Sequence, residues 1–82
     1  MAERHLLPAK RATTGFAKRL LEARNARGLT QTALAKLLRC SDRSIYMLEA
    51  GERSPSMDFL KDIAVALECT TDYLCGLKEW EE

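Results

Sequence analysis

The amino-acid sequence predicts an all-α protein, and three observations support this prediction. Apolar residues recur at spacings of three and four, which is typical of helices that bury one face. Serine or threonine stands where most of these helices would begin, and glycine follows several of them. No segment alternates apolar and polar residues with a period of two, so no strand is expected.

Five helices are expected in one small domain, because 82 residues leave no room for a second core. The first begins at Thr14 and ends at Gly28, where glycine adopts a positive φ at little cost. The other four begin at N-caps, which are Thr30, Ser41, Ser56 and Thr70. The residues expected to face the core are Phe16, Leu20, Ala23, Leu34, Ala35, Leu37, Leu38, Ile45, Leu48, Phe59, Leu60, Ile63, Ala64, Leu67, Tyr73 and Leu74.

The two ends of the chain are expected to flank this domain, which would span residues 15–77. Residues 1–14 are predicted to form a flexible basic arm, since Pro8 interrupts them, and residues 78–82 an acidic tail. The arm either reaches toward the phosphates or a groove of a nucleic acid or is a frayed terminus without a role.

Charge is distributed unevenly along the chain. Residues 1–55 hold 11 Lys and Arg against 5 Asp and Glu, a net charge of +6, whereas residues 56–82 carry −5. This asymmetry indicates one face that meets a polyanion and an acidic remainder, with ordinary solvated charge as the alternative.

Several function classes are disfavoured. No apolar run reaches the roughly 18 residues of a membrane span, and Met1 to Thr14 lack the apolar core of a signal peptide, so a cytoplasmic protein without a membrane role is expected. Cys40, Cys69 and Cys75 are odd in number and form no Cys-x-x-Cys pair, so neither a disulfide framework nor a metal site is expected. The sequence shows no nucleophile–histidine couple and no phosphate-binding glycine loop, so it predicts neither an enzyme nor a cofactor.

Residues 31–50 match a helix-turn-helix, in which two short helices cross at a steep angle around a tight turn. The crossing brings the two backbones close, so one position must be small, and Ala35 fills it. The apolar positions that hold the helices together are Leu34, Leu38, Cys40, Ile45 and Leu48. No proline interrupts either helix.

At this point the chain resembles the phage-repressor and Cro-like family, also called the XRE family. The matching residues are Arg24, Gly28, Leu29, Thr30, Gln31, Leu34, Ala35, Ser41, Ile45, Leu48, Glu49, Gly51, Pro55, Ser56, the stretch 60–67, Thr71, Asp72, Tyr73 and Leu74. The resemblance covers residues 16–77. It implies a compact five-helix, repressor-like domain that binds double-stranded DNA sequence-specifically.

The resemblance also implies roles for individual residues. Gln31 stands where the family's Gln contacts a phosphate and braces the recognition helix, which corresponds to Ser41–Gly51 and lies in the major groove. The candidate base readers are Asp42, Arg43, Tyr46 and Met47. The candidate phosphate contacts are Gln31, Thr30, Ser41, Ser44 and Arg53. Arg24 and Glu49 are expected to form a structural ion pair.

Side-chain chemistry sharpens these roles. Arg43 can bond O6 and N7 of guanine, Asp42 can accept from cytosine N4, and Met47 can touch a thymine methyl. The family usually has glycine in place of Arg39, and a left-handed arginine there costs on the order of 1 kcal/mol. The acidic Asp42, beside Tyr46 and Met47, leaves open a protein partner on the same face.

The expected function is a transcriptional regulator, most simply a repressor, that binds a pseudo-palindromic operator as a homodimer. The dimer is expected to form through the C-terminal half, whose apolar residues are Tyr73, Leu74, Leu77 and Trp80. The alternative for Tyr73 and Leu74 is that they complete the core of the protomer. The alternative function is an antitoxin or another protein-interaction role, with the acidic tail as a docking site.

Overall fold

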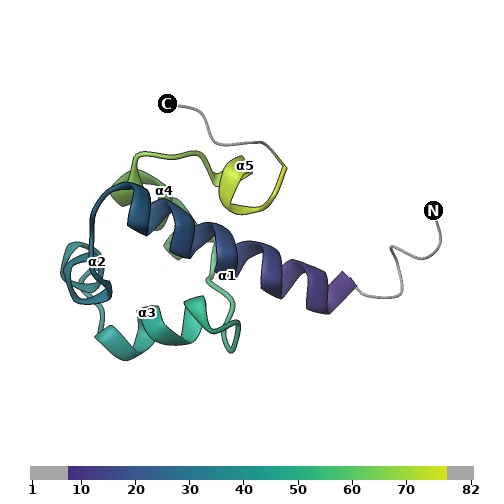
Figure 1. Ribbon diagram of the computed structural model, residues 1–82, viewed down its shortest axis with the longest axis horizontal. Coiled ribbons are helices and arrows are strands. Elements are labelled where there is room, and N and C mark those ends of the chain that lie inside the picture. The colour runs from purple at the N-terminus through teal and green to yellow at the C-terminus, as the bar shows by residue number, and fades with distance from the viewer. Residues whose placement is uncertain (1–7, 78–82) are drawn as a thin grey trace.

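The computed structural model describes the backbone of residues 8–77 and the side chains of residues 15–77. Its helices are α1 (Pro8–Ala26), α2 (Gln31–Leu38), α3 (Asp42–Glu49), α4 (Met57–Leu67) and α5 (Thr71–Leu74). Within the described range there is no strand, so the all-α, five-helix prediction is confirmed. The long helix α1 contacts both α3 and α5, which lie on opposite sides of it (Figure 1).

Each of the four helices after α1 starts at the N-cap that the sequence predicts. The hydroxyl of the cap accepts a hydrogen bond from the backbone N–H three residues later, at 3.0 Å for Thr30 and Thr70 and at 3.1 Å for Ser41 and Ser56. These bonds satisfy donors that a helix end leaves without an intrahelical partner. The local sequence therefore fixes the start of each of these helices.

The first helix begins earlier than expected, at Pro8 rather than Thr14. Proline fits the first position of a helix because its φ is already helical and the N–H that it lacks would have no partner there. Residues 8–14, which were predicted to belong to the arm, therefore form the first part of α1. Residues 1–7 of that arm, like the predicted acidic tail 78–82, lie outside the described residues.

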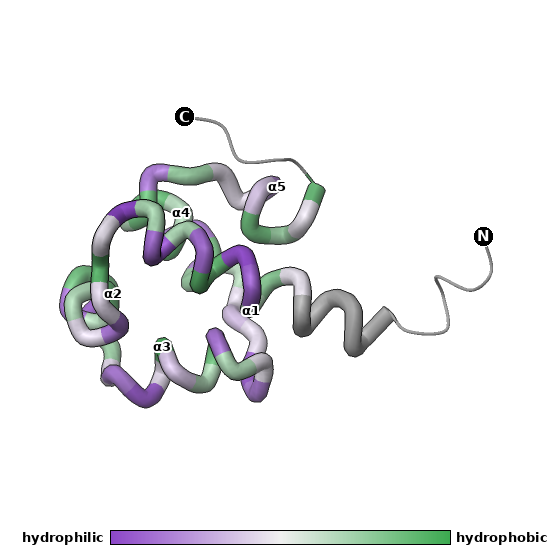
Figure 2. The backbone as a smooth tube through the Cα atoms, in the orientation of Figure 1, coloured by the Kyte–Doolittle hydropathy of each residue, from purple (hydrophilic) through white to green (hydrophobic). Residues whose placement is uncertain are grey.

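The core forms from the apolar stripe of each helix, and every helix carries both hydrophobic and hydrophilic residues (Figure 2). Its largest fully buried side chains are Leu20, Leu34, Ile45, Ile63, Leu67 and Leu74. Leu37 was expected to face inward but is 58% exposed. Helix α2 packs on α3 and α4 through Leu34 and Ala35, and Leu37 falls beyond the edge of that stripe.

The short helix α5 closes the core with Tyr73 and Leu74, which are 5% and 0% exposed. The guanidinium of Arg19 lies 5.0 Å from the centre of the Tyr73 ring, and burial raises the pKa of the Tyr73 phenol above its ordinary value. These two residues therefore complete the protomer and are not available to a dimer interface.

Two helices end on non-glycine residues in the left-handed conformation. Arg39 ends α2 with φ 59° and ψ 45°, and Glu68 ends α4 with φ 55° and ψ 46°. The α4 end is closed by Arg27, which donates to the carbonyl oxygens of Leu67 at 2.7 Å and Glu68 at 2.8 Å. Arg39, in the turn between α2 and α3, therefore adopts the left-handed conformation that glycine normally supplies.

Replacing Arg39 by glycine is expected to stabilise the fold by about 1 kcal/mol, because the left-handed penalty disappears. In a domain of this size that gain corresponds to a rise in Tm of about 4–8 °C. Arg39→Ala is the matched control, since it removes the guanidinium but keeps the strained φ. Equal gains for both variants in thermal denaturation would show that the side chain, and not the backbone, causes the effect.

Candidate nucleic-acid interface

Helices α2 and α3 form a tightly packed pair. Ala35 is 1% exposed at their contact, and Ile45 and Leu48 of α3 are 0% and 2% exposed. The turn between the helices comprises Arg39 to Ser41, and the Cys40 N–H donates to the Ala35 carbonyl at 3.0 Å. This is the packing that the small residue at position 35 predicts.

The opposite face of α3 is open to solvent. Asp42, Arg43 and Tyr46 are exposed, whereas Met47 and Ser44 are partly buried. Because α3 has only eight residues, these side chains share a surface of about two helical turns. The predicted base readers thus lie on one helix, although Met47 presents less of its surface than the others.

Two of the hydroxyl groups among the predicted phosphate contacts already accept N-cap hydrogen bonds. Thr30 caps α2, and Ser41 caps α3 while its Oγ also lies 3.1 Å from Oγ of Ser44. Arg53 is exposed in the segment between α3 and α4. A phosphate at either cap would meet the backbone N–H groups and the positive end of the helix dipole.

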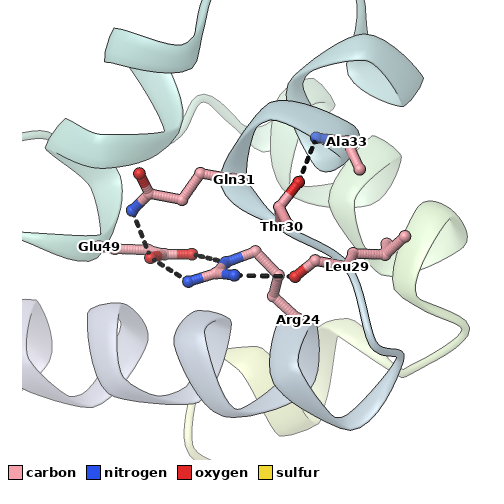
Figure 3. A network of polar contacts seen from close by, with 6 residues as sticks. All are labelled: Arg24, Leu29, Thr30, Gln31, Ala33 and Glu49. Atoms are coloured by element: carbon pink, nitrogen blue, oxygen red, sulfur yellow. Dashed lines mark hydrogen bonds and ion pairs between the residues drawn. The ribbon is translucent and has the colours of Figure 1, made fainter.

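One carboxylate joins the first three helices. Glu49, the last residue of α3, forms an ion pair with Arg24 of α1, with Nε to Oε2 at 2.6 Å and Nη2 to Oε1 at 3.0 Å (Figure 3). The remaining Nη1 of Arg24 donates to the Leu29 carbonyl at 2.8 Å. The two charged side chains are only 11% and 6% exposed, so the expected ion pair is present and largely shielded from water.

Gln31 belongs to the same network: it braces α3, as the resemblance implies, through Glu49, a partner that the sequence did not specify. Its Nε2 donates to Oε1 of Glu49 at 2.9 Å (Figure 3). The side chain therefore braces the end of α3 directly. An amide nitrogen carries two N–H groups. One of them donates to Glu49, and the second is the donor that a phosphate contact would use.

A second contact between α2 and α3 was missed altogether. Oγ1 of Thr32 donates to Oδ2 of Asp42 at 2.6 Å. The spacing of ten residues across a turn carries no sequence signal of its own. It becomes visible only once the two helices are placed, because it depends on how α2 crosses α3.

A half-open pocket of about 400 Å³ lies between α3 and the segment that leads into α4. Its lining comprises Cys40, Ser44, Leu48, Arg53, Ser54, Pro55, Ser56 and Phe59. Burial raises the pKa of the Cys40 thiol above its ordinary value, and the carboxylate of Asp42 raises it further. Near neutral pH this cysteine is therefore a thiol and a poor nucleophile.

The residues described form no cluster that would hold a metal ion, and none of the described helices has the length and apolarity to cross a lipid bilayer.

The packed α2–α3 pair, with the solvent-facing α3, defines the class of helix-turn-helix DNA-binding proteins. The helix-turn-helix family HTH_3 matches residues 20–74, and the chain belongs to this family. The family assignment indicates a DNA-binding protein.

Solved structures agree with this assignment. An HTH_3 family transcriptional regulator from Vibrio cholerae is 32% identical with a TM-score of 0.71, over 77% of this chain and 35% of that one. The restriction-modification controller protein C.AhdI from Aeromonas hydrophila is 32% identical with a TM-score of 0.71, over 76% and 94%. Apo-HppE is 31% identical with a TM-score of 0.74, over 78% and 36%. The chain thus spans about a third of the Vibrio regulator and most of the controller protein. Comparison with curated proteins gave no match.

Removing either partner of the Arg24–Glu49 pair is expected to destabilise the fold by roughly 3–5 kcal/mol, because a shielded charge is left without its partner. Urea denaturation of Arg24→Ala and Glu49→Ala measures this loss. The double variant should lose less than the sum of the two, because neither charge is then left alone. Unchanged unfolding midpoints for both single variants would contradict a structural role.

Proposed function

We propose that the protein is a transcriptional regulator of the repressor type that binds a specific double-stranded DNA operator through α3. The observation that supports this most is the exposed N-terminal turn of α3, where Asp42 and Arg43 stand on a helix fixed to its neighbours by Glu49. A helix presented in this way enters the major groove with its first residues at the base edges. A cytoplasmic location fits this role.

The similarity to a controller protein of a restriction-modification system and to a transcriptional regulator favours a regulatory role. The charge distribution supports DNA as the partner. The exposed acidic residues of the C-terminal helices, Asp58, Asp62 and Asp72, belong to α4 and α5. They lie on elements other than the proposed reading helix.

The proposed division of labour is that Arg43 reads a base while Gln31 positions the protein on the backbone. Arg43 is the second residue of α3 and is exposed, and its planar fork can satisfy O6 and N7 of one guanine. Gln31 is the first residue of α2 and is held by Glu49, so its contact would be to phosphate and independent of sequence.

Arg43→Ala should therefore relax base preference at one position in each half-site, by about 1–3 kcal/mol of discrimination. Gln31→Ala should weaken cognate and near-cognate sites about equally. Operator sites selected from random DNA, followed by titration against all their single-base variants, measure both effects. Arg43→Lys is the matched control, because it keeps the charge but loses the bidentate fork. A uniform loss for Arg43→Ala across the panel would make it a phosphate contact.

We also propose that the regulator acts as a homodimer, since two half-sites give a small domain useful affinity. With Tyr73 and Leu74 buried in the protomer, the apolar residues left for an interface in the described C-terminal part include Val65 and Leu77, which are 79% and 75% exposed. Both lie in the acidic part of the chain, and neither belongs to α3.

Truncation after Gly76 is expected to reduce self-association while the helical circular dichroism stays unchanged, because Leu77 lies outside the core. Leu77→Asp in the full chain should act in the same direction, and Leu37→Asp, on an exposed site of α2, is the matched control. Sedimentation equilibrium measures the association constant. A truncated protein that sediments like the full chain would place the interface elsewhere.

A protein-interaction role, as in an antitoxin, is the second candidate. It is favoured by the exposed Tyr46 and the acidic Asp42 on the same helix, because a tyrosine suits a protein interface and a carboxylate repels phosphate. Random-site selection discriminates the regulator from a protein-interaction role without DNA: recovery of a defined DNA motif supports the regulator, and recovery of no motif supports the protein partner. An antitoxin that also binds DNA would still recover a motif.

A further inference from the structure

A hydrogen bond joins Thr32 of α2 to Asp42 of α3 at the turn between the two helices. Thr32 is the second residue of α2 and Asp42 the first of α3, and Oγ1 lies 2.6 Å from Oδ2. Both residues are exposed, where water competes for the same groups, so this bond adds little to stability. Its main consequence is geometric, since it fixes the direction of a carboxylate at the tip of the reading helix.

We propose that Thr32 is a positioning residue that holds Asp42 for reading a cytosine, an inference that rests on the proposed DNA-binding function. An ionised carboxylate accepts hydrogen bonds on two oxygens. The bond from Thr32 occupies a lone pair of Oδ2, while Oδ1 has no protein donor among the described residues. The major-groove edge of cytosine offers an N4 amino donor, which is the natural partner of such an acceptor.

The charge of Asp42 makes the reading selective. The major-groove edge of guanine offers only acceptors, and that of thymine adds a methyl group to its acceptor, so both repel or fail to satisfy a carboxylate. Adenine pairs its N6 donor with the N7 acceptor, which opposes the second oxygen. A carboxylate in the first turn of α3 is also favoured by the helix dipole.

Without Thr32 the Asp42 side chain samples its staggered rotamers, and only one of them keeps the present direction. Three wells for χ1 imply a loss of roughly threefold in the cytosine preference when the tether is removed. Removal of the carboxylate itself removes the whole preference, which for a good base contact is about 5- to 150-fold. The two residues therefore act on the same operator position but to different extents.

The test uses the full chain and the operator found by random-site selection, with every single-base variant titrated. Asp42→Ala should abolish a cytosine preference at one position, and Thr32→Val, which matches the shape but lacks the hydroxyl, should reduce the same preference by roughly threefold. Thr32→Ser should restore it. Thr32→Val on top of Asp42→Ala should change nothing further at that position.

Thr70→Val is the matched control, because it also removes a threonine hydroxyl, but from the N-cap of α5, outside the proposed DNA-binding surface. It should lower thermal stability and leave base preference intact. The inference is overturned if Asp42→Ala leaves every preference unchanged or if Thr32→Val behaves like Thr70→Val. A wild-type protein that selects an operator but shows no cytosine tied to Asp42 overturns this inference alone. A protein that selects no operator overturns the proposed function as well.

Discussion

The ion pair between Arg24 and Glu49 is the interaction on which the rest of the structure depends. The Glu49 carboxylate accepts hydrogen bonds from Arg24 near the end of α1 and from Gln31, the first residue of α2. Arg24 also donates to the Leu29 carbonyl in the loop between those helices. Two largely shielded charges are costly to separate, because either one alone would be left without its partner. Together these contacts hold the end of α3 against α1 and the start of α2.

This arrangement couples the reading helix to its support. Gln31 serves the network through one N–H and, in the proposed complex, a phosphate through the other. Thr32, the next residue, supports the opposite end of α3 through Asp42. The start of α2 therefore contacts both ends of α3, the proposed recognition helix, so that Asp42 and Glu49 are held by neighbouring residues before any DNA binds. Such preorganisation lowers the entropy that binding must otherwise overcome.

Features encoded by neighbouring residues were predictable from the sequence, and those set by helix packing were not. The four N-caps follow from the serine or threonine at each helix start. The burial of Leu34 and Ile45 follows from local periodicity, since a helix repeats every 3.6 residues. The exposure of Leu37 and the bond from Thr32 to Asp42 depend on how α2 crosses its neighbours, which no local pattern records. The early start of α1 was missed because proline was interpreted as a break rather than as a first helical residue.

The closure of α4 by Arg27 has a consequence for local opening of the fold. This side chain, at the end of α1, covers the last carbonyls of a helix 40 residues further along the chain. Fraying of the α4 terminus must release Arg27, and unwinding of the α1 terminus must expose those carbonyls to water. The two helix ends therefore form one cooperative unit, and their backbone amides should share a common protection against hydrogen exchange although they are remote in sequence.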